Sequence, residues 1–413
     1  MKRNFCQIEP FTHKIFGNNV SLLSGVDELF ELELAYWEFN CLDKEQLLER
    51  SAFIKSIDNQ YTKHYLLYSN YDEKINKNRS ANTQVYFEEG QFSTGYATHG
   101  LFPYRGKFHP QLIKGLLNIL GIKKGETVLD PMAGSGTLNI EASLLGISSI
   151  ACDVSPFCQF MIQTKYEALT IDMKLLDTIP LNIKKIFDFF SKGNAFQKIS
   201  QVGNVEKQKI YNLMLLAWLD ALGYSKRVVR SNHEQLFEKV LPRYLETVRS
   251  TINNPYFRQN EIGKVTILHN SEALKIELPN ESLDCVITSP PYSFAIDYVE
   301  NDKSQLEFLG YEPKELKNKL IGLKGKNKTD RLNTYFTDMD TACEEISRIL
   351  KKDKYFAMII GSNTNQTGGI RLEETIIESA HKNNLSLVKS ILKPIKGMRN
   401  TMKDEYILIF QKR

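Results

Sequence analysis

The chain has 413 residues, 42% of them hydrophobic and 25% charged, and a formal net charge of +4 at pH 7. This composition is typical of an ordinary soluble protein with two or three domains, or with one large domain that carries insertions. No apolar run approaches the roughly 20 residues that a membrane span requires, and the first residues lack the apolar core of a signal peptide. The six cysteines form no C-x-x-C pair and no cluster with histidine. The sequence therefore predicts a cytoplasmic protein with reduced thiols, no metal site and no membrane segment.

Residues 1–90 are predicted to form a small α+β region. The apolar spacing of Val20–Cys41 is helical, whereas Tyr61–Tyr71 and Thr83–Phe87 favour strands. Two interpretations stay open for this region, a nucleic-acid accessory module and a packing extension of the main domain.

Residues 126–137 predict a turn that binds a nucleotide-like ligand. A short apolar strand, Glu126–Asp130, is followed by Pro-Met-Ala-Gly-Ser-Gly-Thr and then by a helix, Leu138–Leu145. Gly134 and Gly136 allow the backbone to approach a ligand closely, and the start of the helix offers free N–H groups. A G-x-G turn alone is weak support, because small turns of this kind are common.

The next strand strengthens this prediction. Ser149–Cys152 ends at Asp153, where a doubly wound fold places the acidic residue that binds ribose hydroxyls. No G-K-[ST] sequence follows the turn, and the carboxylate of Asp130 would repel a triphosphate. A ligand with a cationic amine and a ribose fits instead, and S-adenosylmethionine has both.

A second stretch, residues 284–292, reads Asp-Cys-Val-Ile-Thr-Ser-Pro-Pro-Tyr. The apolar strand must end before the two prolines, because proline fixes φ and has no N–H to donate to a sheet. The stiff loop that follows presents the Ser289 hydroxyl, the Pro290 carbonyl and the Tyr292 ring at one point. Hydrogen-bond acceptors beside a flat aromatic face are suited to holding a planar base by its exocyclic amine. Taken alone, a plain exit from a strand into a turn is the simpler interpretation.

Together, the two stretches resemble the motifs of exocyclic-amino DNA methyltransferases. Residues 130–137 are similar to the D-P-F-x-G-S-G-T cofactor motif of that family, and residues 288–292 to its [DNS]-P-P-[YFW] catalytic motif. The loop and helix start at 98–110 resemble the segment of the family that closes over the methionine end of the cofactor. The resemblance covers roughly residues 96–168 and 264–413.

The resemblance implies an α/β fold built on the seven-stranded, Rossmann-like sheet of S-adenosylmethionine-dependent methyltransferases, which ends in a reversed strand. The apolar runs agree with seven strands, which end near Asp130, Asp153, Leu268, Thr288, Gly361, Ile391 and Phe410. The last two strands, Leu385–Ile391 and Glu405–Phe410, are predicted to pair in antiparallel fashion. Helices are predicted at Tyr335–Leu350 and Glu373–Asn383.

The resemblance also implies the site residues. Catalytic roles fall to four residues in succession, Ser289, Pro290, Pro291 and Tyr292. The cofactor, S-adenosylmethionine, is expected to contact residues of the loop, the turn and the ends of the strands: Tyr104, His109, Asp130, Pro131, Ala133, Gly134, Ser135, Gly136, Thr137, Asp153, Val154, Ser271, Glu272 and Thr288. The contact to adenine is left open among Asn270, Ser271 and Glu272, because the family's acidic turn is replaced here by His-Asn-Ser-Glu.

The chemistry follows from the nature of the amine. An exocyclic amine is a poor nucleophile because its lone pair is delocalised into the ring, and two acceptors on its N–H bonds pull the nitrogen toward a tetrahedral geometry. The expected contribution of the protein is orientation and electrostatic placement, with Tyr292 stacked on a base rotated out of the duplex. C5-cytosine methylation needs a cysteine, typically after proline, and the chain contains no Pro-Cys pair.

The target base is predicted as cytosine N4, because serine precedes the prolines at position 289. Serine-type motifs are not confined to one base, so N6-adenine methylation stays an alternative. A tRNA guanine-N2 methyltransferase is a second alternative, although such enzymes usually have aspartate where Ser289 stands.

Residues 169–262 are predicted to form a helical insertion in a catalytic domain that spans 91–168 and 263–413. Pro242 is expected to kink or divide its second long helix. The insertion stands where some members of the family place target recognition, and we favour that role. A solvated face is the alternative for its basic side chains, Lys184, Lys185, Lys226, Arg227, Arg230, Lys239 and Arg243.

Residues 312–331 carry seven basic and three acidic side chains, and Gly322, Gly325 and Asn327 predict a flexible second half. A mobile cationic loop beside the catalytic motif is suited to gripping phosphates. The predicted DNA-binding residues are Lys314, Lys317, Lys319, Lys324, Lys326, Lys328, Arg331 and Arg399. The expected partners are double-stranded DNA and, acting separately, a cognate restriction endonuclease.

Overall fold

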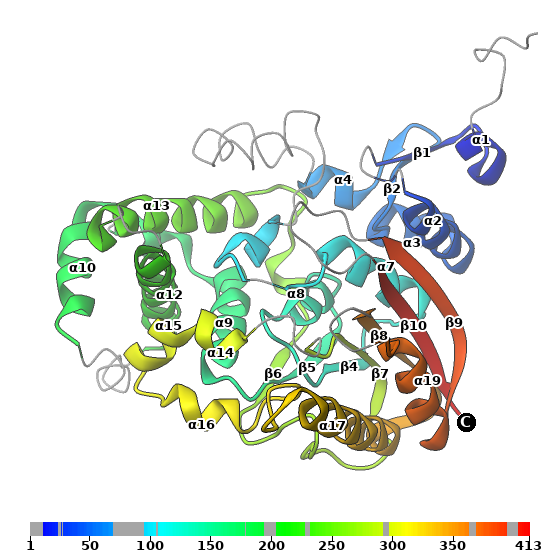
Figure 1. Cartoon of the computed structure of the whole chain (residues 1–413). Coiled ribbons are helices and arrows are strands. Elements are labelled where there is room, and N and C mark those ends of the chain that lie inside the picture. The colour runs from blue at the N-terminus through cyan, green and yellow to red at the C-terminus, as the bar shows by residue number, and fades with distance from the viewer. Residues whose placement is uncertain are drawn as a thin grey trace, which may run out of the picture.

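The computed structural model describes residues 11–23, 26, 28–68, 95–104, 106–177, 179–193, 204–227, 232–291, 297–362, 369–394 and 404–413. Its centre is a seven-stranded sheet in the order β6-β5-β4-β7-β8-β10-β9 (Figure 1). In chain order the strands are β4 (Thr127–Asp130), β5 (Ser148–Cys152), β6 (Val265–Leu268), β7 (Leu283–Thr288), β8 (Leu350–Ser362), β9 (Leu385–Pro394) and β10 (Asp404–Lys412). Strand β10 runs antiparallel to both β8 and β9, and the other pairings are parallel. The predicted seven strands and the reversed last strand are confirmed.

Helices cover both faces of the sheet. One face is covered by α7 (Pro110–Ile119), α8 (Thr137–Leu144) and α9 (Pro156–Glu167), and the other by α17 (Lys328–Ile349) and α19 (Leu372–Lys382). The central strand β7 is buried along its whole length, as a parallel strand between two helical layers must be. The predicted helices at 335–350 and 373–383 are present, and the first of them begins seven residues earlier, at Lys328.

The described residues between 11 and 68 form an α+β unit that packs against this core. A small sheet of β1 (Val20–Leu22), β2 (Ile54–Ile57) and β3 (Gln60–Tyr61) lies with α1 (Phe11–Phe16), α2 (Leu29–Cys41), α3 (Lys44–Arg50) and α4 (Lys63–Tyr68). Their apolar side chains share one cluster with α7 and the sheet. Buried Glu38 of α2 accepts hydrogen bonds from Ser51, Ala52 and Asn118, and so ties the two parts together. These contacts favour the packing extension over a separate module.

In this region the structure differs from one predicted strand and from the start of one predicted helix. The predicted strand Tyr61–Tyr71 is wrong, because Lys63–Tyr68 is helical: the Thr62 hydroxyl accepts a hydrogen bond from the Tyr65 N–H, as an N-cap does. The predicted helix Val20–Cys41 begins only at Leu29, since Val20–Leu22 pairs with β2. The other predicted strand, 83–87, lies outside the described residues.

In Figure 1 the helices of the insertion (green) lie at one end of the molecule, and the N-terminal part (blue) lies toward the other end. They are α10 (Ile183–Ser191), α12 (Val205–Arg227) and α13 (His233–Ile252). The expected division of this helix at Pro242 is wrong, because α13 continues through it, and the alternative of a kink stays a prediction. Pro242 is exposed, so the carbonyl that loses its helical partner there remains open to water. None of the described helices combines the length and apolar character needed to cross a membrane.

Candidate functional site

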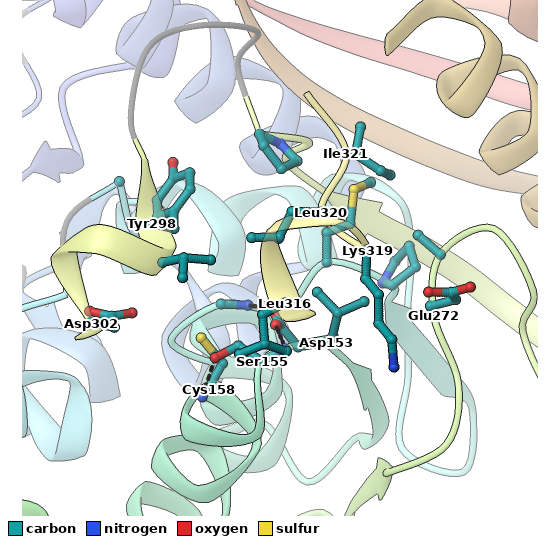
Figure 2. A pocket seen from close by; sticks show the side chains of 18 of the residues that line it. Asp153, Ser155, Cys158, Glu272, Tyr298, Asp302, Leu316, Lys319, Leu320 and Ile321 are labelled. Carbon is teal, nitrogen blue, oxygen red and sulfur yellow. Dashed lines mark hydrogen bonds between the residues drawn. The ribbon is translucent and has the colours of Figure 1, made fainter. Parts of the chain in front are cut away.

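A cavity of about 910 Å³, its solvent-filled mouth included, opens at the carboxyl ends of β4, β5, β6 and β7 (Figure 2). Within the sheet, β5 and β6 lie on one side of β4, and β7 lies on the other side of β4. The strand order therefore reverses at this point, and open α/β sheets bind their ligands at such a point.

The turn between β4 and α8 forms the floor of the cavity through Pro131, Met132 and Gly134. Gly134 has a φ of +50°, and a Cβ there would lie 3.3 Å from the ring of Tyr104. Only glycine fits this backbone without strain, and its bare backbone faces the space that a ligand would occupy. Of the predicted residues, Pro131 and Gly134 are thus placed at the cavity.

The rest of the predicted turn lies behind the floor. Ala133, Ser135, Gly136 and Thr137 do not line the cavity, because here the chain turns into α8 and packs against α9. A Cβ on Gly136, where φ is +74°, would meet Ile162 of α9 at 2.7 Å. This second glycine serves the packing of helix on helix.

Asp130 lies directly beneath the floor and is fully buried. Its Oδ1 accepts hydrogen bonds from the Thr288 hydroxyl (2.7 Å) and from the Met132 N–H (3.1 Å). Its Oδ2 has no hydrogen-bond partner among the described residues. Burial raises the pKa of Asp130 to about 7, against the two hydrogen bonds, which lower it. Asp130 itself does not line the cavity, whereas Pro131 and Met132, which follow it, do.

Asp153 connects the end of β5 to the turn. Its two oxygens accept the N–H groups of Gly134 and Ser155, each at 2.8 Å, and burial raises its pKa. A carboxylate oxygen has capacity for more than one donor, so hydroxyls of a ligand remain acceptable partners. Asp153, Val154 and Ser155 all line the cavity.

The turn after β6 contributes Glu272, Ala273 and Leu274 to the wall. Ser271 does not line the cavity: its hydroxyl donates to the Lys275 carbonyl (3.1 Å) and accepts from the Glu277 N–H (2.9 Å). Of the alternatives that the sequence left open, only Glu272 faces the cavity.

The end of β7 brings the predicted catalytic residues to the same place. Ser289 and Pro291 line the cavity, and Pro290 between them is buried. Thr288 lies one layer below and bonds Asp130, so the catalytic loop and the cofactor turn are joined directly. Tyr292 lies outside the described residues.

The loop before α7 contributes Tyr104 to the cavity. Its ring lies nearly parallel to that of Tyr298, at 14° with 6.1 Å between centroids, and its hydroxyl is 3.6 Å from the Cys158 thiol. His109 does not line the cavity, because it lies at the start of α7, where burial lowers its pKa to about 4.

The roof of the cavity was not predicted from the sequence. It comes from α14 (Tyr298–Asn301), α15 (Lys303–Phe308), α16 (Pro313–Lys317) and the chain just after α16. The residues that line it, shown in part in Figure 2, are Tyr298, Val299, Asp302, Leu306, Leu316, Lys319, Leu320 and Ile321. Only the apolar side chains Leu316, Leu320 and Ile321 among the many lysines of this segment pointed to a buried face.

The basic segment 312–331 contains α16 and the start of α17, with turns and bends between them, and the predicted flexibility of its second half stays a prediction. Asn327 caps α17 by accepting the Asp330 N–H at 2.9 Å, and Lys324 pairs with Asp338 at 3.0 Å. Lys317 pairs with Asp297 at 2.8 Å. Of the predicted DNA-binding residues, Lys319 is exposed at the cavity, and four more are exposed with no ion pair among the described residues: Lys314, Lys326, Lys328 and Arg331. Arg399 lies outside the described residues.

No group of three or more histidine, cysteine or acidic side chains able to hold a metal ion occurs in the part of the chain that the structure describes. The site is thus built from backbone, carboxylates, aromatic rings and apolar side chains.

Comparisons with known proteins agree with this architecture. A family model described as an RMKL-like methyltransferase domain matches residues 101–199. The Type II methyltransferase M.BsoBI of Geobacillus stearothermophilus is 23% identical over 63% of this chain and 63% of its own length. M.MvaI of Kocuria varians, also a Type II methyltransferase, is 20% identical over 80% of this chain and 91% of its own. These matches support the predicted resemblance to DNA methyltransferases.

A third protein that this chain resembles is a tRNA (guanine(10)-N2)-dimethyltransferase of Methanocaldococcus jannaschii. It is 42% identical over 85 residues, which are 21% of this chain and 24% of that protein. The match to M.BsoBI likewise leaves more than a third of that relative uncovered. The activity and the substrate of this chain are therefore matters for a proposal.

Proposed function

We propose that this chain is a site-specific DNA methyltransferase, which transfers a methyl group from S-adenosylmethionine to the exocyclic N4 amine of cytosine in duplex DNA. One observation carries the proposal: Ser289 and Pro291 open on the same cavity as Gly134 and Asp153. Residues predicted to hold the amine and residues predicted to bind the cofactor thus line one cavity.

The residues at the cavity fit this cofactor. We propose that its ammonium group reaches the unpaired Oδ2 of Asp130, behind the cavity floor, and that its ribose hydroxyls bind Asp153 at the cavity wall. Leu274 and Ile321 offer apolar surface to an adenine ring, and Glu272 offers an acceptor for the amine of that ring. When bound, S-adenosylmethionine supplies an electrophilic methyl group on a positively charged sulfonium.

The proposed role of the protein in the reaction is to orient the amine. We propose that the Ser289 hydroxyl and the Pro290 carbonyl accept its two N–H bonds, which makes the nitrogen lone pair available. Since Thr288 is bonded to Asp130 at 2.7 Å, the two halves of the site have a defined separation. Fixed placement of this kind supplies much of the catalysis in such reactions. Tyr292 is proposed to stack on the rotated base.

Two other substrates stay in competition. N6-adenine methylation uses the same placement of acceptors, and it moves only the target base. The short match to a tRNA (guanine(10)-N2)-dimethyltransferase supports an RNA substrate. Serine at position 289 argues against the RNA alternative, because tRNA guanine-N2 methyltransferases usually have aspartate at this position of the motif.

Duplex DNA is the proposed partner, gripped at its phosphates by exposed Lys314, Lys326, Lys328 and Arg331 beside the roof of the cavity. A cognate restriction endonuclease that acts separately is proposed with it.

The test is transfer of labelled methyl from S-adenosylmethionine to duplex DNA and, separately, to tRNA, with the products digested to nucleosides and identified by mass. N4-methylcytosine from DNA is the expected product. N6-methyladenine would move the target base, and a methylated guanosine from tRNA with unlabelled DNA would overturn the proposed substrate.

A further inference from the structure

The helical insertion holds the loop that carries Tyr104 into the cavity. Tyr244 of α13 is fully buried, and its hydroxyl accepts the N–H of Phe102 at 2.7 Å. The same hydroxyl donates to Oδ2 of Asp220 on α12 at 3.0 Å, and Arg243 donates to that oxygen from the other side at 3.0 Å. Both long helices of the insertion therefore contribute to one hydrogen bond outside it.

The residue held in this way has a strained backbone. Phe102 has a φ of +61°, a left-handed conformation that is strained for a residue with a Cβ. Its ring is buried against Phe157, with 4.9 Å between the centroids. Strain of this kind persists only where the surroundings determine the conformation, and here a buried hydrogen bond and a buried ring do so.

The strained residue sets the position of Tyr104. The carbonyl of Phe102 accepts the N–H of Tyr104 at 2.9 Å, across Pro103. The Tyr104 ring then lies against Gly134, at 3.3 Å from where a Cβ would stand, and parallel to Tyr298. Two successive hydrogen bonds thus lead from the insertion to the wall of the cavity.

We propose that Tyr244, supported by Asp220, is a positioning residue for cofactor binding: it fixes Phe102, and through Phe102 it places the Tyr104 ring over the cofactor turn. The inference rests on the proposed function, in which this cavity binds S-adenosylmethionine. It makes the helical insertion a part of the cofactor site, so a displacement of α12 and α13 by a bound partner reaches the cofactor through Tyr104.

The first test is the Tyr244→Phe variant, which removes the hydroxyl and keeps the ring. Its affinity for S-adenosylmethionine, measured by titration calorimetry, is expected to fall about tenfold, while kcat at saturating cofactor changes less than about twofold. The matched control is Tyr335→Phe, because Tyr335 is equally buried and its hydroxyl has no hydrogen-bond partner among the described residues. That variant is expected to keep the wild-type affinity.

A cofactor-free measurement separates positioning from general loosening. Hydrogen exchange of a peptide that covers residues 100–104 is expected to accelerate in Tyr244→Phe and to stay slow in Tyr335→Phe. In a Tyr104→Leu background, Tyr244→Phe is expected to change the affinity by less than about twofold, because the pathway is already broken.

Unchanged affinity in Tyr244→Phe, or effects of Tyr104→Leu and Tyr244→Phe that simply add, would overturn the inference. Absence of cofactor binding by the wild type would instead refute the proposed function, and the exchange of the Phe102 amide would still decide whether Tyr244 positions the loop.

Discussion

Asp130 is a buried carboxyl group whose pKa lies far above the ordinary value of an aspartate. Burial raises its pKa to about 7, so the folded chain holds a proton that the unfolded chain has lost between about pH 4 and pH 7. Folding is therefore most favoured by this group at low pH, and its contribution is lost as the pH rises toward 7. A bound cation has the opposite preference, because it needs the ionised carboxylate.

This opposition predicts a pH dependence of binding. The affinity for S-adenosylmethionine is expected to increase as the pH rises through about 7, since the proton of Asp130 must leave. In Asp130→Asn the increase is expected to disappear along with most of the affinity. Titration calorimetry between pH 6 and pH 8, in buffers of different ionisation enthalpy, would measure the proton release. Binding that is independent of pH in the wild type would contradict this role of Asp130.

Ser289 is predicted to act on the amine and not on the cofactor. Ser289→Ala removes one of the two acceptors, and kcat is expected to fall about 100-fold, as it does when one stabilising hydrogen-bond group is lost from an active site. Affinity for S-adenosylmethionine is expected to change less than about twofold. Ser282→Ala at the start of β7 is the control, because that hydroxyl bonds only the Pro279 carbonyl in the described part of the chain. Loss of cofactor affinity in Ser289→Ala would assign the serine a different role.

At the scale of elements, the turn between β4 and α8 depends on the backbone of Gly134. Gly134→Ala is expected to cost about 1 kcal/mol of stability, because φ is +50°, and to weaken cofactor affinity about tenfold, because the new Cβ lies 3.3 Å from Tyr104. Gly121→Ala is the matched control: φ there is +71°, and no atom lies within 4 Å of the new Cβ.

Thermal melts and cofactor titrations on both glycine variants separate strain from contact. Both are expected to lose similar stability, and only Gly134→Ala is expected to lose affinity. Equal affinities in the two variants would show that Tyr104 and the turn do not bind the cofactor jointly.

The elements that were predicted well are those with a local signal. The strands of the large sheet are apolar runs bounded by glycine, proline or acidic residues, and the structure has them within a few residues. Helix α4 was missed because its aromatic residues have high strand propensity, while its start depends on the Thr62 cap. Local capping overrode propensity there.

The site was predictable only where it follows a motif. Pro131, Gly134, Asp153 and Ser289 stand next to strand ends, so sequence order alone brings them to one edge of the sheet. The roof could not be predicted from the sequence, because lysines dominate the composition of residues 312–331. Only three apolar side chains of this segment, Leu316, Leu320 and Ile321, face the cavity. The bond from Tyr244 to Phe102 joins residues 142 apart, and no local pattern reports such a contact.

At the scale of the whole molecule, charge distribution sets where a polyanion would bind. Lys326, just before α17, and Lys328, the first residue of α17, are exposed at the end of the sheet where the cavity opens. Lys123 and Lys264 are equally exposed but precede the amino ends of β4 and β6. The amino ends of parallel strands lie on one side of a sheet and their carboxyl ends on the other. The two lysine pairs therefore mark opposite sides of the molecule.

The two pairs allow a matched test of DNA binding. The double variant Lys326→Gln, Lys328→Gln is expected to weaken duplex binding and to lower the slope of log K against log salt by up to about 2, the number of phosphate contacts removed. The double variant Lys123→Gln, Lys264→Gln lowers the net charge equally, and it is expected to leave the slope unchanged. Fluorescence anisotropy with one duplex between 50 and 200 mM salt, a range chosen because counterion release dominates it, would measure both slopes. Equal loss in both variants would mean that the charge of the whole molecule attracts DNA, and a loss confined to the Lys123 and Lys264 pair would place the DNA at the other edge of the sheet.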